Sequence, residues 1–200
     1  MNYSHIISSF DSSTLAERLN NGSAALFPTD TLPALAASPK HASQLWEIKQ
    51  RPKDKPLILM GSCSNQLFEF IAESALKDAK LIAKLYWPGA LTLILPAKGP
   101  IVDSLNPGGS NLGMRIPDCE VTLELLSKSG PLATTSANLA GESPFLCAEE
   151  ASKCFPDLPA LGPVPWPVSS GCASTVIIWR GSENWQVLRR GAVILENLLN

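Results

Sequence analysis

The chain has 200 residues, of which 45% are hydrophobic and 17% charged, and its formal net charge is −2. Average proteins carry roughly 25% charged residues, and disordered chains are charge-rich and apolar-poor, so this composition excludes disorder as the default. The 17 prolines break up long helices and exclude an all-helical bundle or a coiled coil. The overall charge points to neither nucleic acid nor an anionic membrane, so an anion site has to come from a local cluster.

Apolar spacing and turn residues predict alternating helices and strands along the chain. In the first half we expect a helix at 14–20, opened by a capping box from Thr14 to Glu17, a strand at 24–27, a helix at 39–49, a strand at 57–60, helices at 65–72 and 75–85, and a strand at 91–95. In the second half we expect strands at 112–116 and 131–135 with a helix at 119–128 between them, a short helix at 148–153, and a hairpin from 174–179 and 185–188.

Two segments are predicted to be loops. Residues 98–111 are rich in Gly, Pro and Asn, and residues 155–173 form a long proline-rich stretch that either folds over something or lies disordered. Helices alternate with strands, but a hairpin also occurs. This mixture predicts a single α/β domain over residues 1–200, with a twisted mixed β-sheet flanked by helices.

Other patterns exclude several kinds of site. The five cysteines are odd in number and form no CxxC pair, which favours reduced thiols over a disulfide framework or a zinc site. His5 and His41 are too few and too far apart for a histidine metal site. The first ten residues lack the features of a signal peptide, and prolines interrupt the uncharged stretch at 158–179. We therefore expect a cytoplasmic protein with no membrane partner.

The sharpest local feature is the segment 49–56, Lys-Gln-Arg-Pro-Lys-Asp-Lys-Pro. Because Pro52 ends the preceding helix, these four cations are predicted to lie on a loop before a core strand. Arg51 offers a planar fork for phosphate oxygens, and the lysines act as point charges. The segment is therefore either a phosphate site or an ordinary solvated loop.

Two segments rich in hydroxyl groups each follow a predicted strand. Residues 28–31 read Pro-Thr-Asp-Thr, and residues 134–138 read Thr-Thr-Ser-Ala-Asn. Polar side chains at a strand end are placed where open α/β sheets bind ligands. A turn with local side-chain hydrogen bonds explains the first segment equally well, and a helix cap explains the second.

Arg115 lies inside an apolar predicted strand, where burial requires an anionic partner, either a carboxylate of the protein or one of a ligand. Ser174 enters the predicted hairpin, and Arg189 follows it. Walker, GxGxxG, GxSxG and HExxH motifs are absent from the sequence. An enzyme with these residues would act on anionic substrates by positioning and electrostatics rather than through a covalent nucleophile.

Taken in this order, seven segments resemble the YrdC-like domain of threonylcarbamoyl-AMP synthases. They are Pro-Thr-Asp-Thr at 28–31, Ile-Lys-Gln-Arg-Pro-Lys-Asp-Lys-Pro-Leu-Ile at 48–58, Trp-Pro-Gly-Ala-Leu-Thr at 87–92, Met-Arg-Ile-Pro at 114–117, Ser-Ala-Asn at 136–138, Ser-Thr-Val at 174–176 and Leu-Arg at 188–189. The resemblance spans about residues 6–195.

The resemblance implies a twisted α/β fold around a large concave basic cavity. It also implies a reaction, in which L-threonine, bicarbonate and ATP give L-threonylcarbamoyladenylate and diphosphate. That product serves the N6-threonylcarbamoyl modification of adenosine 37 in tRNA. The implied partners are tRNA or double-stranded RNA and downstream threonylcarbamoyl-transfer proteins. The chain resembles the family's short form, without the C-terminal domain of the long form.

The resemblance also assigns residues, position by position. Lys49 and Arg51 would be catalytic. The implied ATP-binding residues are Lys49, Arg51, Lys55, Ser136, Asn138, Ser143 and Arg189. The implied threonine-binding residues are Thr31, Arg115, Thr134 and Ser174, with Arg115 on the carboxylate. Mg²⁺ is expected with the triphosphate, and no metal is expected to be bound by the protein itself. Alanine at Lys49 or Arg51 is expected to weaken ATP use and leave the fold intact, because both are predicted to lie on a polar loop.

The sequence departs from the family pattern at Pro33, Ala34, Ala140 and Arg190. Proline fixes φ and removes a backbone donor, and alanine disfavours a positive φ. These departures leave three functions open. The chain is an active synthase, a divergent paralogue that binds nucleotide or double-stranded RNA or tRNA without synthesis, or an enzyme that uses ATP on another amino acid or carbamoyl acceptor.

Overall fold

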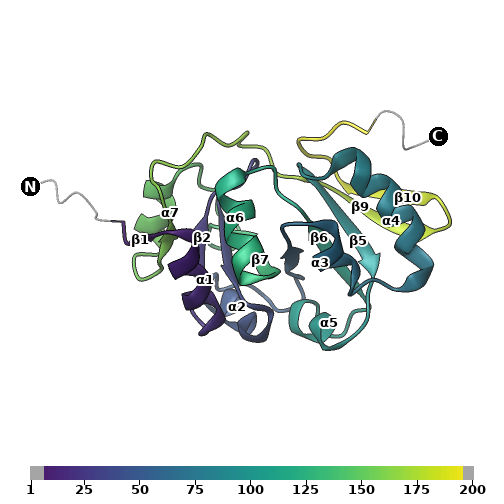
Figure 1. The fold of residues 1–200 in the computed structure, drawn as a ribbon, viewed down its shortest axis with the longest axis horizontal. Coiled ribbons are helices and arrows are strands. Elements are labelled where there is room, and N and C mark those ends of the chain that lie inside the picture. The colour runs from purple at the N-terminus through teal and green to yellow at the C-terminus, as the bar shows by residue number, and fades with distance from the viewer. Residues whose placement is uncertain (1–6, 196–200) are drawn as a thin grey trace, which may run out of the picture.

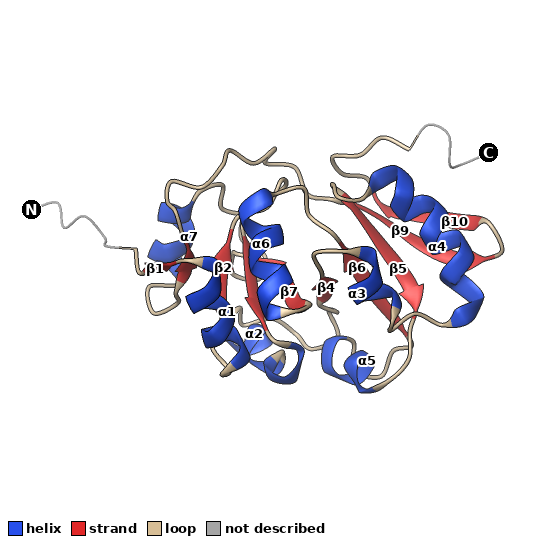
Figure 2. Cartoon of the chain, viewed as in Figure 1, coloured by secondary structure: helices blue, strands red, loops and turns tan. Residues whose placement is uncertain are grey.

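The computed structural model describes residues 7–195, which include ten strands in one mixed sheet (Figures 1 and 2). Across the sheet the strands follow the order β1-β8-β2-β3-β7-β4-β6-β5-β9-β10. The strands are β1 Ser9–Phe10, β2 Ala25–Phe27, β3 Ala34–Ala37, β4 Ile58–Met60, β5 Leu91–Pro96, β6 Asn111–Arg115, β7 Leu132–Ser136, β8 Ala160–Leu161, β9 Thr175–Gly181 and β10 Asn184–Arg189. The helices are α1 Ser12–Asn20, the 3-10 turn η1 Pro39–His41, α2 Ser43–Ile48, α3 Ser64–Phe68, α4 Glu73–Tyr86, α5 Pro100–Leu105, α6 Glu120–Ser129 and α7 Ala148–Cys154.

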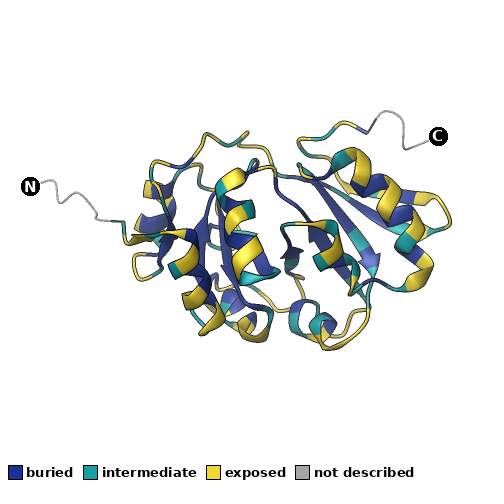
Figure 3. Cartoon of the chain, in the orientation of Figure 1, coloured by how far each residue is buried: buried dark blue, intermediate teal, exposed yellow. Residues whose placement is uncertain are grey.

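One face of the sheet is apolar across most of its width. Because successive side chains of a strand point to opposite faces, residues in register share a face. Pairing places in one row Ala37, Ala133, Leu59, Met114, Leu93 and Ile177. All six belong to the larger core cluster, to which helices α2, α4, α5 and α7 also contribute buried residues. Strands β2 to β8 are accordingly mostly buried, whereas the edge strand β10 and the outer faces of the helices are largely exposed (Figure 3).

The opposite face is apolar over only part of the sheet. There α1 and α6, which lie side by side in Figure 1, pack on β2 and β3 through a second cluster. This cluster extends to Met60 of β4. Beyond it, the same face carries Thr134, Arg115 and Thr92, which line a cavity. The helical cover therefore stops where polar side chains begin.

The structure confirms most of the predicted elements, including the buried strand at 57–60, the helix at 75–85 and the hairpin at 174–188. The capping box at Thr14 is wrong. The N-cap of α1 is Asp11, whose carboxylate accepts the backbone N–H groups of Ser13 and Thr14 at 2.9 and 3.0 Å. The predicted helix at 39–49 is divided into η1 and α2.

Four elements were missed, which are β1, β3, α5 and β8. Strand β8 lies inside the predicted loop at 155–173 and pairs with β1 and β2, and β1 and β8 have only two residues each. Strand β3 has the sequence Ala-Leu-Ala-Ala, and alanine has little preference for strands, but β3 is buried between β2 and β7. Helix α5 lies inside the predicted loop at 98–111. Pro100 begins it after Gly99, which has a φ of 88°, so the Gly-Pro pair is the start of a helix rather than of a turn.

Within residues 7–195, no helix is long and apolar enough to cross a membrane. All five cysteines lie in this range and are free thiols. His5, and the first six residues considered for a signal peptide, lie outside the described residues.

Candidate functional site

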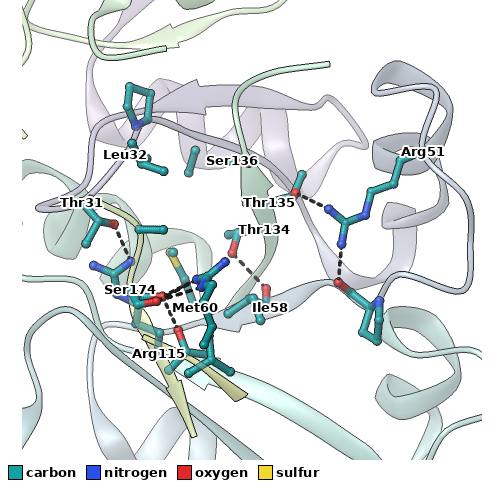
Figure 4. Close-up of a pocket in the computed structure, with 17 residues that line it drawn as sticks. Thr31, Leu32, Arg51, Ile58, Met60, Arg115, Thr134, Thr135, Ser136 and Ser174 are labelled. Atoms are coloured by element: carbon teal, nitrogen blue, oxygen red, sulfur yellow. Dashed lines mark hydrogen bonds between the residues drawn. The ribbon is translucent and has the colours of Figure 1, made fainter. Parts of the chain in front are cut away.

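A cavity of about 210 Å³ opens on the polar part of the sheet (Figure 4). It is lined by Thr31, Leu32, Pro33, Ala34, Arg51, Pro56, Ile58, Met60, Thr92, Arg115, Thr134, Thr135, Ser136, Ala173, Ser174, Val176 and Arg189. Seven of the eleven predicted site residues are among them, and they come from six separate segments of the chain: Thr31, Arg51, Arg115, Thr134, Ser136, Ser174 and Arg189. The lining contains three arginines and neither Asp, Glu, Lys nor His.

Arg115 lies at the end of β6 and is 3% exposed. Its Nε donates to the carbonyl of Gly89 at 2.9 Å, Nη1 to Oγ1 of Thr31 at 2.7 Å, and Nη2 to Oδ1 of Asp30 at 2.5 Å. Burial lowers the pKa of Arg115, and the Asp30 carboxylate opposes that shift. Of the two partners that the sequence left open, the structure therefore provides the carboxylate of the protein.

Hydroxyl groups surround this end of the cavity. Oγ1 of Thr31 also lies 3.0 Å from Oγ1 of Thr29, and Oγ of Ser174 lies 2.8 Å from Oγ1 of Thr92. Arg189 donates from Nε and Nη2 to the carbonyl of Ser174 at 3.1 and 2.9 Å. These bonds join the start of β9 to the end of β10 and hold both on the rim of the cavity.

Arg51 lies on the other side of the cavity in Figure 4, away from Thr31 and Arg115. Its Nη2 donates to the carbonyl of Pro56 at 3.1 Å, and its Nη1 makes a long contact of 3.4 Å with Oγ1 of Thr135. Its Nε is buried and has no hydrogen-bond partner within residues 7–195. A buried donor without an acceptor costs about 1–3 kcal/mol, so this guanidinium is suited to bind an added anion.

Lys49 lies outside the cavity lining and is only 1% exposed, so the prediction that it lies on a polar loop is wrong. Its Nζ donates to the carbonyls of Ser136 and Asn138, and to Oδ1 of Asn138 at 3.1 Å. Burial lowers its pKa to about 8, and the charge of Arg51 adds to the shift. Lys49 therefore holds the 136–138 segment in place through these hydrogen bonds.

Asn138 belongs to the same network and is also outside the lining. Its Oδ1 accepts from Ser136 Oγ at 2.6 Å, and its Nδ2 donates to the carbonyls of Leu139 and Glu142 at 3.1 and 2.6 Å. Every polar atom of this side chain is thus engaged within the protein, so Asn138 shapes the loop that carries Ser136.

The structure leaves two predicted ATP residues away from the cavity. Lys55 is exposed on the loop before β4, and Ser143 is exposed in a separate hollow that Phe145 and Glu150 also line. Neither is brought together with the seven lining residues. Lys55 and Ser143 were assigned to ATP by the family resemblance, and no other pattern in the sequence supports that assignment.

Several lining residues were not predicted as site residues. Thr92 and Thr135 stand within the quoted segments, and their hydroxyl groups beside a strand end were the available signal. Met60 and Val176 had no such signal, because an apolar strand residue looks the same whether it faces a core or a cavity. The departures at Pro33 and Ala34 do not strain the backbone: Ala34 pairs with Ser136 in β3, and the carbonyl of Pro33 accepts from Ala137 N at 2.9 Å.

Comparison with known proteins agrees with the resemblance found in the sequence. A family model for Sua5, YciO and YrdC proteins, described as "Telomere recombination", matches residues 17–191. The threonylcarbamoyl-AMP synthase of Bacillus subtilis is 39% identical over 135 residues, which cover 64% of this chain and 38% of that protein. The synthase of Idiomarina loihiensis is 33% identical over 136 residues, covering 66% of this chain and 73% of that protein. The chain thus spans well under half the length of the Bacillus relative.

Solved structures show the same fold. Pyrococcus abyssi Sua5 complexed with L-threonine is 28% identical, with a TM-score of 0.83 over 90% of this chain and 54% of that one. Escherichia coli YciO is 21% identical, with a TM-score of 0.79 over 94% of this chain and 92% of that one, a likeness that concerns the fold alone.

Proposed function

The chain belongs to the Sua5/YciO/YrdC family, and from that premise we propose that it is a threonylcarbamoyl-AMP synthase. The observation that carries the proposal is the unpartnered, buried Nε of Arg51, in a cavity lined by two more arginines and no acid. Such a site attracts an anionic substrate, and relatives named for this activity share the family. The substrates would be L-threonine, bicarbonate and ATP.

We place the phosphates at the Arg51 end of the cavity. Arg51 is the only lining residue on that side with a cationic group, and its Nε lacks an acceptor among the described residues. A phosphate oxygen would satisfy this donor in a charge-assisted hydrogen bond. Ser136 lies between the two ends, and Lys49 and Asn138 fix its loop. Ser143 and Lys55 would contact ATP only where it extends beyond the cavity.

We place threonine at the Arg115 end. The hydroxyl groups of Thr31 and Ser174 suit a polar substrate, and Met60 and Val176 offer an apolar wall for its methyl group. Thr134 is turned toward the sheet, because its Oγ1 donates to the carbonyl of Ile58 at 3.0 Å. The ligand named for the P. abyssi relative is L-threonine, which supports threonine as the substrate. At about 210 Å³ the cavity is smaller than typical ligand pockets of roughly 300–1,000 Å³, so ATP would extend outside it.

The chemistry requires no protein nucleophile. The amine of threonine and bicarbonate give N-carboxythreonine with loss of water and one proton. An oxygen of the new carboxylate on the nitrogen then attacks the α-phosphorus of ATP, the P–O bond to the β-phosphate breaks, and diphosphate leaves. Arg51 would hold the phosphate charge that this step redistributes, and a fixed guanidinium stabilises such charge without reorganisation. Arg189, which is bound to the carbonyl of Ser174, would add its charge from the Arg115 end of the cavity. Walls such as Ala34, Met60 and Val176 would limit the access of water.

Mg²⁺ is expected with the triphosphate. Mg²⁺ sites in proteins use carboxylates together with phosphate oxygens. The cavity lining contains no carboxylate, and the described residues hold no group of three or more His, Cys, Asp or Glu that could bind a metal. The chain's own residues therefore do not fit a magnesium site at this position, and we assign no step to the ion.

The remaining features of the proposal follow from the reaction. The product would supply the threonylcarbamoyl group for adenosine 37 of tRNA, through downstream transfer proteins, and tRNA or double-stranded RNA remains a proposed partner. We propose a cytoplasmic protein, because ATP and tRNA are found there. We also propose that residues 1–200 act as a single YrdC-like domain, since one sheet extends through the described residues.

The test is detection of threonylcarbamoyladenylate by mass spectrometry after incubation of the purified protein with threonine, bicarbonate and ATP. We expect product only when all three are present. Arg51→Met is expected to lower kcat/KM for ATP by about 100-fold, the loss seen when one charge-stabilising donor is removed. Lys53→Met, on the exposed part of the same loop, is the matched control and should behave like the wild type.

Two outcomes would contradict the proposal. The first is a wild-type protein that forms no threonine-dependent product. If that protein still binds ATP or double-stranded RNA, it is the divergent paralogue. If it releases diphosphate with another amino acid, its substrate differs. The second is an Arg51→Met variant with unchanged kcat/KM for ATP, which would remove the phosphate site from the Arg51 end.

A further inference from the structure

Asp30 is the acidic residue nearest to the cavity's most buried cation, although it does not line the cavity. Its Oδ1 lies 2.5 Å from Nη2 of Arg115, and the two side chains are 17% and 4% exposed. A buried guanidinium is unfavourable without a counter-ion, so Arg115 depends on this contact. Asp30 is outside the set of residues that the family resemblance assigns to either substrate.

The carboxylate of Asp30 is itself held in place. Its Oδ1 also accepts the backbone N–H of Asp118 at 3.1 Å, at the turn before α6. Its main-chain carbonyl accepts from Ser170 N at 3.0 Å, and the carbonyl of Thr31 accepts from Gly171 N at 3.1 Å. Asp30 is therefore fixed from two sides, and it cannot follow Arg115 if that side chain rotates.

The contacts of Arg115 fix the plane of its guanidinium. Nε is bound to the carbonyl of Gly89, Nη1 to Thr31, and Nη2 to Asp30. A guanidinium has five N–H groups, so these three bonds leave one N–H on each terminal nitrogen to bind a ligand. Because planar, paired donors recognise a carboxylate with high specificity, their orientation determines whether the amino acid is held.

We propose that Asp30 is a positioning residue for the amino-acid substrate, which acts through Arg115 without touching the substrate. This inference rests on the proposed function, because it assumes that a carboxylate binds at Arg115. A positioning residue differs from a member of a purely structural ion pair in one respect. A structural pair would support the fold and affect both substrates alike, whereas a positioning residue affects threonine selectively and only while Arg115 is present.

The first experiment compares substrates. We expect Asp30→Ala to raise the KM for threonine at least 10-fold and to change the KM for ATP less than twofold, because Arg51 lies at the other end of the cavity. Asp30→Asn keeps an oxygen acceptor for both donors and should recover part of the loss. It also serves as the folded variant if Asp30→Ala does not fold. Asp118→Ala is the matched control, since it removes a nearby exposed carboxylate but keeps the backbone N–H that Asp30 accepts.

The second experiment is a double-mutant cycle with Arg115→Met. If Asp30 acts through Arg115, Asp30→Ala should change threonine affinity less than twofold in the Arg115→Met background. Affinity is measured by calorimetry with L-threonine, so turnover is not required. Independent, multiplying effects of the two substitutions would overturn the proposal, and so would equal threonine affinity of Asp30→Ala and the wild type. A wild-type protein that gives no binding heat with threonine would instead overturn the proposed function together with this inference.

Discussion

At the scale of single residues, Lys49 carries a charge that is surrounded by oxygen atoms of one loop. Three acceptors face its ammonium group: two main-chain carbonyls and the amide oxygen of Asn138. An ammonium group has three N–H donors, so this arrangement satisfies all of them. The loop that bears Ser136 is thus held in shape by the ammonium group of Lys49. The stability of the protein, and the way this stability changes with pH, should both depend on Lys49.

Replacement of Lys49 by methionine keeps the length of the side chain and removes the donors. We expect Lys49→Met to lower the free energy of unfolding by about 1–3 kcal/mol, because buried carbonyls are left without partners. Urea unfolding measures this change. Lys53→Met, on the exposed part of the loop, is the control and should stay within about 0.5 kcal/mol of the wild type. Equal stability of both variants would show that the ammonium group is not part of the core.

The same lysine should make stability depend on pH. Its pKa is lowered from the ordinary 10.5 to about 8 in the folded state, so between these values the unfolded chain binds more protons. Stability therefore rises with pH in this window, by at most about 1.4 kcal/mol per pH unit. The wild type should gain about 2 kcal/mol over Lys49→Met between pH 7.5 and 9.5. A difference that stays constant or shrinks in urea unfolding at the two pH values would contradict the lowered pKa.

At the scale of elements, Asp78 connects helix α4 to the C-terminal hairpin. Its Oδ2 accepts from Nε1 of Trp179 in β9 and from the backbone N–H of Glu183 in the turn before β10, both at 2.8 Å. Asp78 is buried, and these bonds lower its pKa. Arg189, which holds the rim of the cavity, lies at the far end of the same hairpin. The position of the rim therefore depends on this connection.

We expect Asp78→Ala to lower the free energy of unfolding by about 1–3 kcal/mol, because two donors lose their acceptor. Lys80→Ala, at an exposed position of the same helix, is the control. Thermal unfolding followed by circular dichroism measures both variants. A melting temperature for Asp78→Ala equal to that of the control would mean that the hairpin packs on α4 without this residue.

Some elements could be predicted from local patterns and others could not. The strand Ile58–Met60 is a continuous apolar run between Pro and Gly, and the chain signals it directly. Strand β3 has no such signal, because its alanines become a strand only through pairing with β2 and β7. The site shows the same limit. The need of Arg115 for an anionic partner could be predicted, because this residue lies in an apolar strand. The burial of Lys49 could not be predicted, because it depends on carbonyls that lie 87 and 89 positions later in the chain.

At the scale of the whole molecule, β7 joins the two halves of the sheet. It pairs with β3 on one side and with β4 on the other, antiparallel to both. A chain that ends at residue 130 lacks β7 and leaves both neighbouring strands with open edges. We expect that truncated chain to show no cooperative thermal unfolding, in contrast to the full chain. A single sharp transition in its calorimetric trace would mean that the first part of the chain folds alone.

The position of β7 also matters while the chain is being made. Strand β3 ends at Ala37 and β7 begins at Leu132, so the ribosome adds about 95 residues before β3 can be paired on both sides. At roughly 5–20 residues per second, this delay is on the order of 5–20 s. During that time β3 and β4 present unpaired strand edges, which are sites of aggregation. The nascent chain should therefore be a client of ribosome-associated chaperones until its last third emerges.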